Sequence, residues 1–246
     1  MDVRQNAIKT TRPVRIAAPV PAANRLLAAL PRNEGRRLID QLEQVALTYG
    51  EVLYEPGELI KFVYFPNDSL VSLLTLVDGH QALEVGLVGR EGMVGIPLSL
   101  GSSISPVRAL VQGSGTAMRM NAAPFLKELG QSLALHLELH RYTYNLMSQI
   151  TQTAACNRFH VVDARLARWL LMTHDRLRVN PFRLTQEFLS QMLGVRRVGV
   201  TNAARTLQKN MLIRYSRGNI TILDRKGLEA ASCSCYAVVK NMCDAA

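Results

Sequence analysis

The chain has 246 residues, of which 48% are hydrophobic and 20% charged, and its formal net charge is +10. This composition is typical of a globular protein with room for two domains, and it excludes a disordered or membrane-embedded chain. Charged or polar residues interrupt every apolar run before the roughly 18 residues that a membrane span needs. We therefore expect no membrane partner.

Residues 1–23 are basic and rich in Pro and Ala. They lack the continuous apolar core of a secretory signal, so we expect a flexible tail on a cytoplasmic protein. Three of the four cysteines lie near the end of the chain, a spacing that does not form a disulfide framework for a protein of this size.

The excess positive charge is confined to the second part of the chain. Residues 1–140 hold 13 Lys and Arg against 13 Asp and Glu, whereas residues 141–246 hold 16 against 6. A basic region joined to a neutral one indicates that the second part contacts a polyanion while the first does something else. On charge alone, the alternative is a basic surface that serves only solubility.

Residues 24–131 are predicted to form a β domain with a helical preface. Apolar periodicity over 24–45, broken at Pro31, predicts the preface. Asp78-Gly79 is the best hairpin signal that follows, because glycine adopts positive φ at low cost. Turn residues about every ten positions are typical of an antiparallel barrel or sandwich. The strands are predicted at 51–54, 62–66, 70–77, 82–88, 109–113 and 117–120.

Residues 132–160 are predicted to form one long helix with an apolar stripe along one face. Such a stripe is typical of a dimerisation seam, which would make the protein a homodimer. The equal alternative is that the stripe packs against the chain's own β domain. The stripe residues are Leu135, Leu139, Tyr142, Leu146 and Ile150.

The segment 184–208 within the last region, 161–246, contains two helical patterns around one glycine. Thr185 fits the N-terminal cap of the first helix, because its hydroxyl can accept a hydrogen bond from a backbone amide. Gly194 ends that helix, since only glycine takes the left-handed conformation without steric cost. Two helices around such a turn predict a helix-turn-helix, with a packed helical hairpin as the alternative.

The second of these helices, which begins near Arg196, exposes long polar side chains. In the major groove of double-stranded DNA, arginine donates two hydrogen bonds to guanine and Asn or Gln matches adenine, each pair discriminating by roughly 1–3 kcal/mol. Hydroxyls and helix N-termini suit phosphates. The residues predicted to contact DNA are Thr185, Arg196, Arg197, Gly199, Thr201, Asn202, Arg205 and Arg217.

The residues after the second helix predict a wing. LIRYSRGNITIL, residues 212–223, reads as two strands joined by a turn at 217–219, and a helical pattern resumes in DRKGLEAA. A β-hairpin directly after the second helix makes a winged helix-turn-helix. Arg217 at its tip is placed to contact a neighbouring phosphate.

This order of elements resembles the Crp/Fnr (catabolite activator protein) family of bacterial transcription regulators over residues 24–230. The family's motif runs approximately T-R-Q-E-I-G-x-x-x-G-x-S-R-E-T-V-x-R, and here the segment is LTQEFLSQMLGVRRVGVTN, in which Thr185, Gly194, Arg197 and Val200 match. The resemblance implies an α+β fold, with an N-terminal antiparallel β-roll that is cyclic-nucleotide-binding-like, a long dimerisation helix and a C-terminal winged helix-turn-helix.

The resemblance also assigns roles to residues and partners. It implies that Arg197 reads guanine and that RNA polymerase is a partner. Val198 stands where the family usually has a base-reading glutamate, and Asn202 where a second arginine is common. Because valine cannot accept a hydrogen bond from cytosine, we expect a target sequence that differs from the best-known family site.

The sensor half departs further from the family. Its nucleotide-binding members carry approximately G-E-L-G, with a ribose-binding glutamate, and then an arginine followed by a hydroxyl residue. Here Met93 replaces the glutamate and Ala109 follows Arg108. These departures disfavour cyclic AMP and leave open another small-molecule or nucleotide effector, or none. The candidate effector pocket comprises Gly92, Met93, Gly95, Arg108 and Ala109.

No metal site is assigned from the sequence. Residues 1–155 contain no cysteine, so the iron–sulfur device of oxygen-sensing family members is absent. Cys233 and Cys235 are close enough to bind a metal or be oxidised, but two thiols lack the four ligands of a closed site, and idle thiols are the alternative. His136 and His140, one helical turn apart, are interpreted as surface or interface histidines.

An enzyme is not expected, because the sequence has no nucleophile elbow, no P-loop and no dinucleotide-binding glycine motif. The sequence favours a homodimer that places two recognition helices about 34 Å apart on an inverted-repeat DNA site. The alternative is a sensory or scaffold protein whose winged helix binds another protein.

Overall fold

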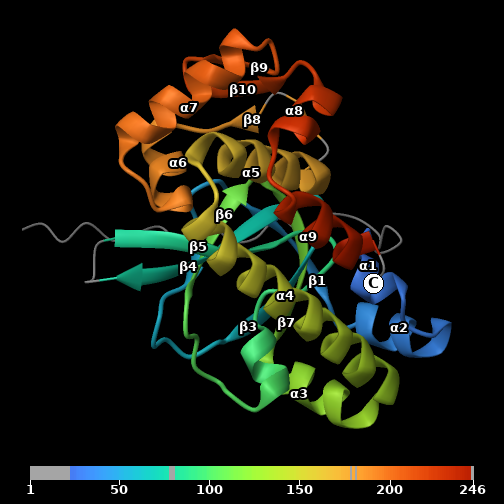
Figure 1. The fold of residues 1–246 in the computed structure, drawn as a ribbon. Helices are drawn as coiled ribbons and strands as arrows, with labels where there is room; N and C mark the ends of the chain where they lie inside the picture. Colours follow the sequence, from blue (N-terminus) through green and yellow to red (C-terminus); the bar gives the residue numbers. More distant parts are fainter. Residues whose placement is uncertain (1–22, 78–80, 178, 181, 245–246) are drawn as a thin grey trace, which may run out of the picture.

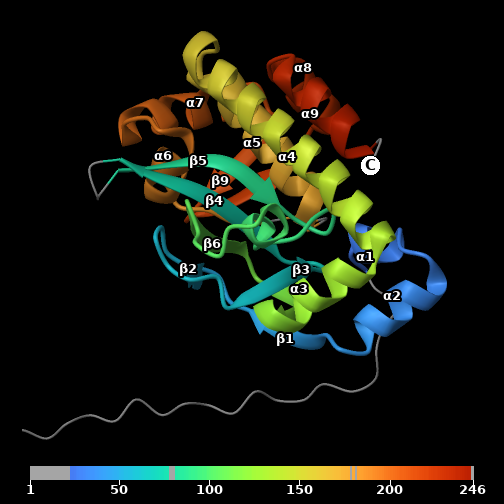
Figure 2. The ribbon, with the colours of Figure 1, turned by 90° about the horizontal axis from the view of Figure 1, so that it is seen from below.

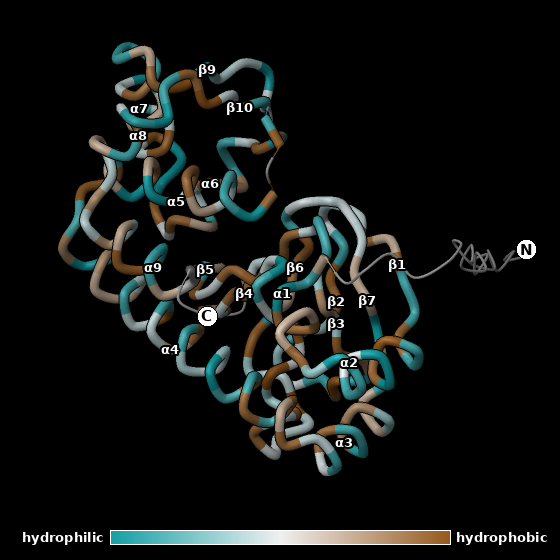
Figure 3. Tube along the Cα trace, turned by 90° about the vertical axis from the view of Figure 1, so that its right-hand side faces the viewer, coloured by the Kyte–Doolittle hydropathy of each residue, from teal (hydrophilic) through white to brown (hydrophobic). Residues whose placement is uncertain are grey.

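The computed structural model describes residues 23–77, 81–177, 179–180 and 182–244, shown as a ribbon in Figure 1. The predicted tail, apart from residue 23, and the predicted Asp78-Gly79 turn lie outside the described residues. Two lobes are visible in Figure 3, a larger one rich in strands and a smaller one rich in helices. No helix in the described ranges combines the length and apolar character needed to cross a membrane.

The described chain begins with two short helices, α1 (Arg25–Ala28) and α2 (Arg32–Ile39), separated at Pro31. The helical preface is thus confirmed as far as residue 39. The prediction is wrong at its end, because residues 43–47 form strand β1 (Glu43–Leu47). This strand pairs along its whole length with a distant strand near residue 117, and such tertiary pairing overrides a local helical pattern.

The strands of the larger lobe form a β-roll of two antiparallel sheets, with the orders β1-β7-β3 and β2-β6-β4-β5. Each predicted strand is confirmed to within two residues at its ends. A short 3-10 helix, η1 (Ile96–Leu100), lies in the connection between β5 and β6. The remaining strands are β2 (Val52–Tyr54), β3 (Phe62–Pro66), β4 (Leu70–Val77), β5 (Gln81–Val88), β6 (Arg108–Gly113) and β7 (Gly115–Asn121).

Two helices complete the larger lobe, α3 (Ala122–Gln131) and the long helix α4 (Leu133–Phe159). Ser132 caps α4 by accepting a hydrogen bond from the Leu135 amide at 3.0 Å. In Figure 2, α4 crosses the molecule along one side of the strands. The long helix is therefore confirmed, with its start one residue later than predicted.

The predicted apolar stripe of α4 packs inside the chain. Leu135, Leu139, Tyr142 and Leu146 are buried in the core of the β-roll, and Ile150 packs against the same core. The stripe therefore packs against the chain's own β domain, which was the second of the two interpretations. Four of the five side chains are thus buried within a single chain, and Ile150 is half-buried.

The smaller lobe follows α4 directly and ends in a helix that was not predicted, α9 (Cys235–Asp244). This helix returns to lie beside α4 (Figures 1 and 2). The other elements are α5 (Val162–Leu177), β8 (Phe182–Arg183), α6 (Gln186–Leu193), α7 (Arg197–Lys209), β9 (Ile213–Ser216), β10 (Asn219–Ile222) and α8 (Arg225–Ala231). The predicted α+β class, with a β-roll, a long helix and a winged helix-turn-helix, is confirmed.

The two lobes share a hydrophobic core. Leu70, Leu74 and Leu87 of the β-roll belong to the same buried cluster as Trp169 and Leu170 of α5. Helix α5 therefore packs directly on the β4-β5 ribbon, and α6 also contacts β5. The position of the helix-turn-helix relative to the β-roll is fixed by this packing.

Candidate nucleic-acid interface and the sites around it

The first helix of the helix-turn-helix, α6, begins and ends as its sequence predicts. The Thr185 hydroxyl accepts a hydrogen bond from the Phe188 amide at 3.1 Å, which satisfies one of the free amides at the helix start. Gly194 lies in the left-handed region, with φ 59° and ψ 42°, and ends the helix. The turn that positions the second helix thus depends on these two residues.

The second helix, α7, has one buried face and one exposed face. Its buried residues are Val200, Ala203, Ala204 and Leu207, as predicted. The side chains of Arg197, Asn202 and Arg205 are exposed on the opposite face. Because these long donors stand on a helix whose other face is held by the core, their positions along the helix are fixed.

The remaining predicted contacts on α7 have different surroundings. Arg196 is the exposed N-cap residue, and Gly199 is half-buried in the first turn. Thr201 is half-buried, and its hydroxyl lies 3.0 Å from both the Gln186 side-chain oxygen and the Arg197 carbonyl. Thr201 therefore ties α7 to α6, a structural role that sequence reasoning did not anticipate.

The predicted wing is present as the β9-β10 hairpin. Its turn residues Arg217 and Gly218 both have positive φ, 51° and 77°, as a tight two-residue hairpin turn requires. Strand β8, which was not predicted, adds a third strand beside β10. The Leu184 amide donates to the Gly218 carbonyl at 2.6 Å, so the hairpin tip is held next to the start of α6, with Arg217 exposed.

The five residues of the candidate effector pocket differ in their surroundings. Met93 and Ala109 are buried in the core of the β-roll. The Tyr142 ring lies so close over Gly92 that a Cβ there would be 2.1 Å from the ring. Gly95, with φ 105°, begins η1, and Arg108 pairs with Glu55 through a 2.7 Å contact between Nε and Oε2.

A buried polar network joins the β-roll to α5. Trp169 Nε1 donates to Glu84 Oε1 at 2.7 Å, and Gln112 Nε2 donates to Thr173 Oγ1 at 3.1 Å. Ser72 Oγ lies 2.8 Å from Glu84 Oε2 and 2.6 Å from Gln112 Oε1. Burial raises the pKa of Glu84 to about 7, in spite of hydrogen bonds from Ser72 and Trp169 that lower it.

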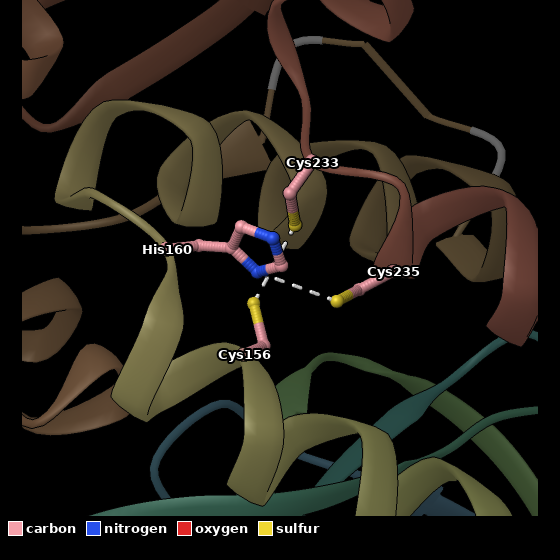
Figure 4. Close-up of side chains that lie close together, drawn as sticks. All are labelled: Cys156, His160, Cys233 and Cys235. Carbon is pink, nitrogen blue, oxygen red and sulfur yellow. Dashed lines mark hydrogen bonds between the residues drawn. The ribbon is translucent and has the colours of Figure 1, made fainter.

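A cluster of thiols and one imidazole lies where α4 meets α9. Its members are Cys156, His160, Cys233 and Cys235, and one potential ligand atom from each lies within 4.8 Å of all the others. Figure 4 shows the four side chains converging from the end of α4 and from the segment that leads into α9. A hydrogen bond with Cys156 lowers the pKa of the Cys233 thiol. Sequence reasoning considered only Cys233 and Cys235.

Comparison with known proteins identifies the C-terminal lobe. Residues 164–231 match the family model described as a Crp-like helix-turn-helix domain. No curated protein sequence matches the chain. The match to a family model is therefore confined to the helix-turn-helix domain.

Solved structures extend the likeness to the whole fold. FixK2 from Bradyrhizobium japonicum superposes with a TM-score of 0.67 at 15% identity, covering 78% of this chain and 98% of its own. A putative Crp/Fnr-family regulator from Eubacterium rectale gives 0.65 at 19% identity, covering 84% and 96%. The c-di-GMP-responsive global regulator CLP from Xanthomonas campestris gives 0.65 at 14% identity, covering 79% and 100%.

These matches confirm the resemblance drawn from the sequence. The chain has the fold of the Crp/Fnr transcription regulators and carries a Crp-like helix-turn-helix domain.

Proposed function

We propose that the protein is a transcription regulator that binds double-stranded DNA in a sequence-specific way. The observation that carries this proposal is the exposed face of α7, which presents Arg197, Asn202 and Arg205 from a helix-turn-helix that is flanked by a wing. An α-helix fits the major groove, and arginine and asparagine are the side chains that pair with guanine and adenine.

Contacts to the DNA backbone are assigned to the edges of this surface. Arg196 stands at the N-terminus of α7, where free backbone amides and the helix dipole favour a phosphate. Thr185, Gly199 and Thr201 are assigned further backbone contacts, and Arg217 is exposed in the turn of the wing. These contacts set the position of the protein on the duplex, while the side chains of α7 read its sequence.

We propose that the active form is a homodimer, joined through the face of α4 that points away from the β-roll. Exposed residues recur on this face at alternating spacings of four and three, the repeat of a coiled coil. Tyr144 and Met147 at its centre expose 68% and 63% of their surface. The face comprises Leu133, Leu137, His140, Tyr144, Met147, Thr151, Ala154 and Arg158.

Two copies joined in this way would present two α7 helices to an inverted-repeat site with half-sites about 34 Å apart. We propose that the bound dimer acts through contact with RNA polymerase in the cytoplasm, as the family resemblance implies. Any effector acts by favouring one dimer geometry over another.

We propose that such an effector is not cyclic AMP. Arg108, which the resemblance aligns with a phosphate ligand, is already paired with Glu55, and the Tyr142 ring covers Gly92. Met93 has no group that accepts from a ribose hydroxyl. An effector that used this part of the β-roll would first have to displace the Tyr142 ring.

Selection of bound duplexes from a random DNA pool tests the proposed function. We expect an enriched inverted repeat, and binding that weakens steeply between about 50 and 200 mM salt because several Lys and Arg displace counterions. A scaffold protein whose winged helix contacts another protein is the second candidate. That reading predicts no enriched sequence, and its protein contact would change little with salt.

A further inference from the structure

The thiol cluster joins two parts of the chain that are far apart in sequence. Cys156 lies in the last turn of α4, and His160 follows directly as its C-cap residue. Cys233 lies in the connection after α8, and Cys235 is the first residue of α9. Cys156 and Cys233 are 77 positions apart, so only the tertiary fold brings the four side chains together.

The distances within the cluster fit a single tetrahedral metal ion. Cys156 Sγ lies 3.5 Å from Cys233 Sγ, and Cys235 Sγ lies 3.5 Å from His160 Nδ1. With Zn–S bonds of about 2.3 Å and Zn–N bonds of about 2.0 Å, a tetrahedral ion separates two sulfurs by about 3.8 Å and a sulfur from a nitrogen by about 3.5 Å. Small side-chain adjustments therefore suffice to coordinate an ion.

The surroundings of the cluster suit bound thiolates. Cys156, Cys233 and Cys235 are buried together in a small core of their own. Gln152 Nε2 donates a hydrogen bond to Cys235 Sγ at 3.0 Å, which is the kind of outer contact that orients a metal ligand. One of the three sulfurs therefore already has a hydrogen-bond donor beside it.

The four side chains fit a zinc ion better than an iron–sulfur cluster or a disulfide. Three thiolates and one imidazole form a four-ligand set of the structural zinc type. An iron–sulfur cluster has its own iron and sulfide atoms between the ligands, so it needs the ligand sulfurs further apart than a single ion does. A disulfide between Cys156 and Cys233 would need the sulfurs at about 2.05 Å and would leave Cys235 and His160 without a function.

We propose that Cys156, His160, Cys233 and Cys235 bind one structural Zn²⁺ ion, which fastens α9 to the joint between α4 and α5. The inference goes beyond DNA recognition and does not depend on it. It accounts for the meeting of three cysteines and one histidine at a single point, from two distant parts of the chain.

The joint that this ion would fix connects the β-roll to the helix-turn-helix. Residues 160 and 161 separate α4 from α5. Arg165 in the first turn of α5 donates to Asn157 Oδ1 at 2.7 Å and to the Leu193 carbonyl in α6. Helix α9 packs against both α4 and α5. A zinc ion here would hold α4, α5 and α9 in one arrangement, so its loss would loosen the C-terminal helix first.

Metal analysis of the purified full chain tests the proposal. We expect about one zinc ion per chain, and its loss in Cys233→Ser. Cys243→Ser is the matched control, because it removes the one cysteine outside the cluster and should keep the ion. His160→Cys should also keep it, since four thiolates form an ordinary zinc site, whereas His160→Ala should lower the content.

Two further measurements keep the proposal falsifiable if a variant fails to fold. Wild-type protein loaded with Co²⁺ should show the strong visible absorption of tetrahedral cobalt–thiolate coordination. Removal of zinc by a chelator should speed amide exchange in α9 and leave β4 and β5 protected. Wild-type protein that holds no zinc and takes up none under reducing conditions would overturn the proposal. A Cys156–Cys233 disulfide or stoichiometric iron in place of zinc would overturn it as well.

Discussion

The Trp169 indole donates a hydrogen bond to the Glu84 carboxyl group at 2.7 Å, across the boundary between the helical lobe and the β-roll. Glu84 is buried, and its neighbour Ser72 has a single hydroxyl proton for two close acceptors, Glu84 Oε2 and Gln112 Oε1. Protonation of Glu84 relieves this competition, because the carboxyl proton can be donated to Ser72 Oγ while the Ser72 hydroxyl donates to Gln112 Oε1. The geometry thus agrees with the raised pKa.

This network predicts a pH dependence of stability. Because the folded-state pKa of Glu84 is about 7 and the unfolded value 4.5, the folded state holds the proton more tightly. The stabilising contribution is fully present below pH 4.5 and is lost as the pH rises through 7, a change of about 3 kcal/mol. Urea unfolding of the wild type at pH 5 and pH 8 measures the loss.

The matched variant is Glu84→Gln, whose amide reproduces the protonated pattern by donating to Ser72 and accepting from Trp169. Between pH 5 and pH 8, the free energy of unfolding of Glu84→Gln should change less than that of the wild type. At pH 8 the variant should have the larger free energy of unfolding. Equal pH dependence in both proteins would show that Glu84 is ionised in the folded state throughout.

Gly92→Ala should destabilise the β-roll. A Cβ at this position would lie 2.1 Å from Tyr142 Cε2, so the ring must move within a packed core, at a cost of about 1–3 kcal/mol. Gly130→Ala is the control, because a Cβ there meets nothing within 4 Å, and helix α3 should gain up to about 1 kcal/mol. Thermal unfolding should show a lower stability for Gly92→Ala and a higher stability for Gly130→Ala. If the stability of Gly92→Ala equals that of the wild type, the Tyr142 ring does not lie over Gly92.

The proposed dimer face predicts an effect of charge on assembly. Met147→Glu places a carboxylate at the centre of the exposed α4 face and should convert dimers to monomers at micromolar concentration. Leu126→Glu is the control, since Leu126 is 44% exposed on α3 and is not one of the residues of this face. Sedimentation equilibrium measures the mass of each. If the Met147→Glu protein stays dimeric, the dimer interface lies on another surface.

The wing predicts a contact that does not depend on sequence. Arg217→Ala should weaken binding by a similar factor on every duplex and lower the salt slope of log K by about one, because one phosphate contact is removed. Fluorescence anisotropy at several salt concentrations separates this from a base contact. A selective loss on one duplex sequence would instead place Arg217 at a base edge.

Local patterns predicted much of this fold because the turns and caps are encoded nearby in sequence. The Thr185 cap, the Gly194 stop and the turn at Arg217 were each found where their chemistry requires them. Strand β1 and strand β8 were missed, since both are defined by pairing with distant strands. The apolar stripe of residues 135–150 predicted that one face of α4 is covered, but the pattern did not indicate which surface covers that face.

The thiol cluster shows the limit of local reasoning most clearly. Cys233 and Cys235 were visible as a pair. Cys156 is 77 positions from Cys233 and His160 is 75 positions from Cys235, and both join the pair only when α9 folds back onto α4. The signal that was available is the one isolated cysteine at 156, one helical turn before a histidine. Spacing of four on a helix places both on one face.

The affinity of wild-type protein and Arg197→Ala for the selected DNA and for a scrambled duplex tests the central claim most directly. We predict that the wild type prefers the selected site and that Arg197→Ala loses roughly 1–3 kcal/mol on it, with preference relaxed at one base pair in each half-site. Equal affinity of the wild type for both duplexes, or an equal loss on both in the variant, would contradict sequence reading by α7.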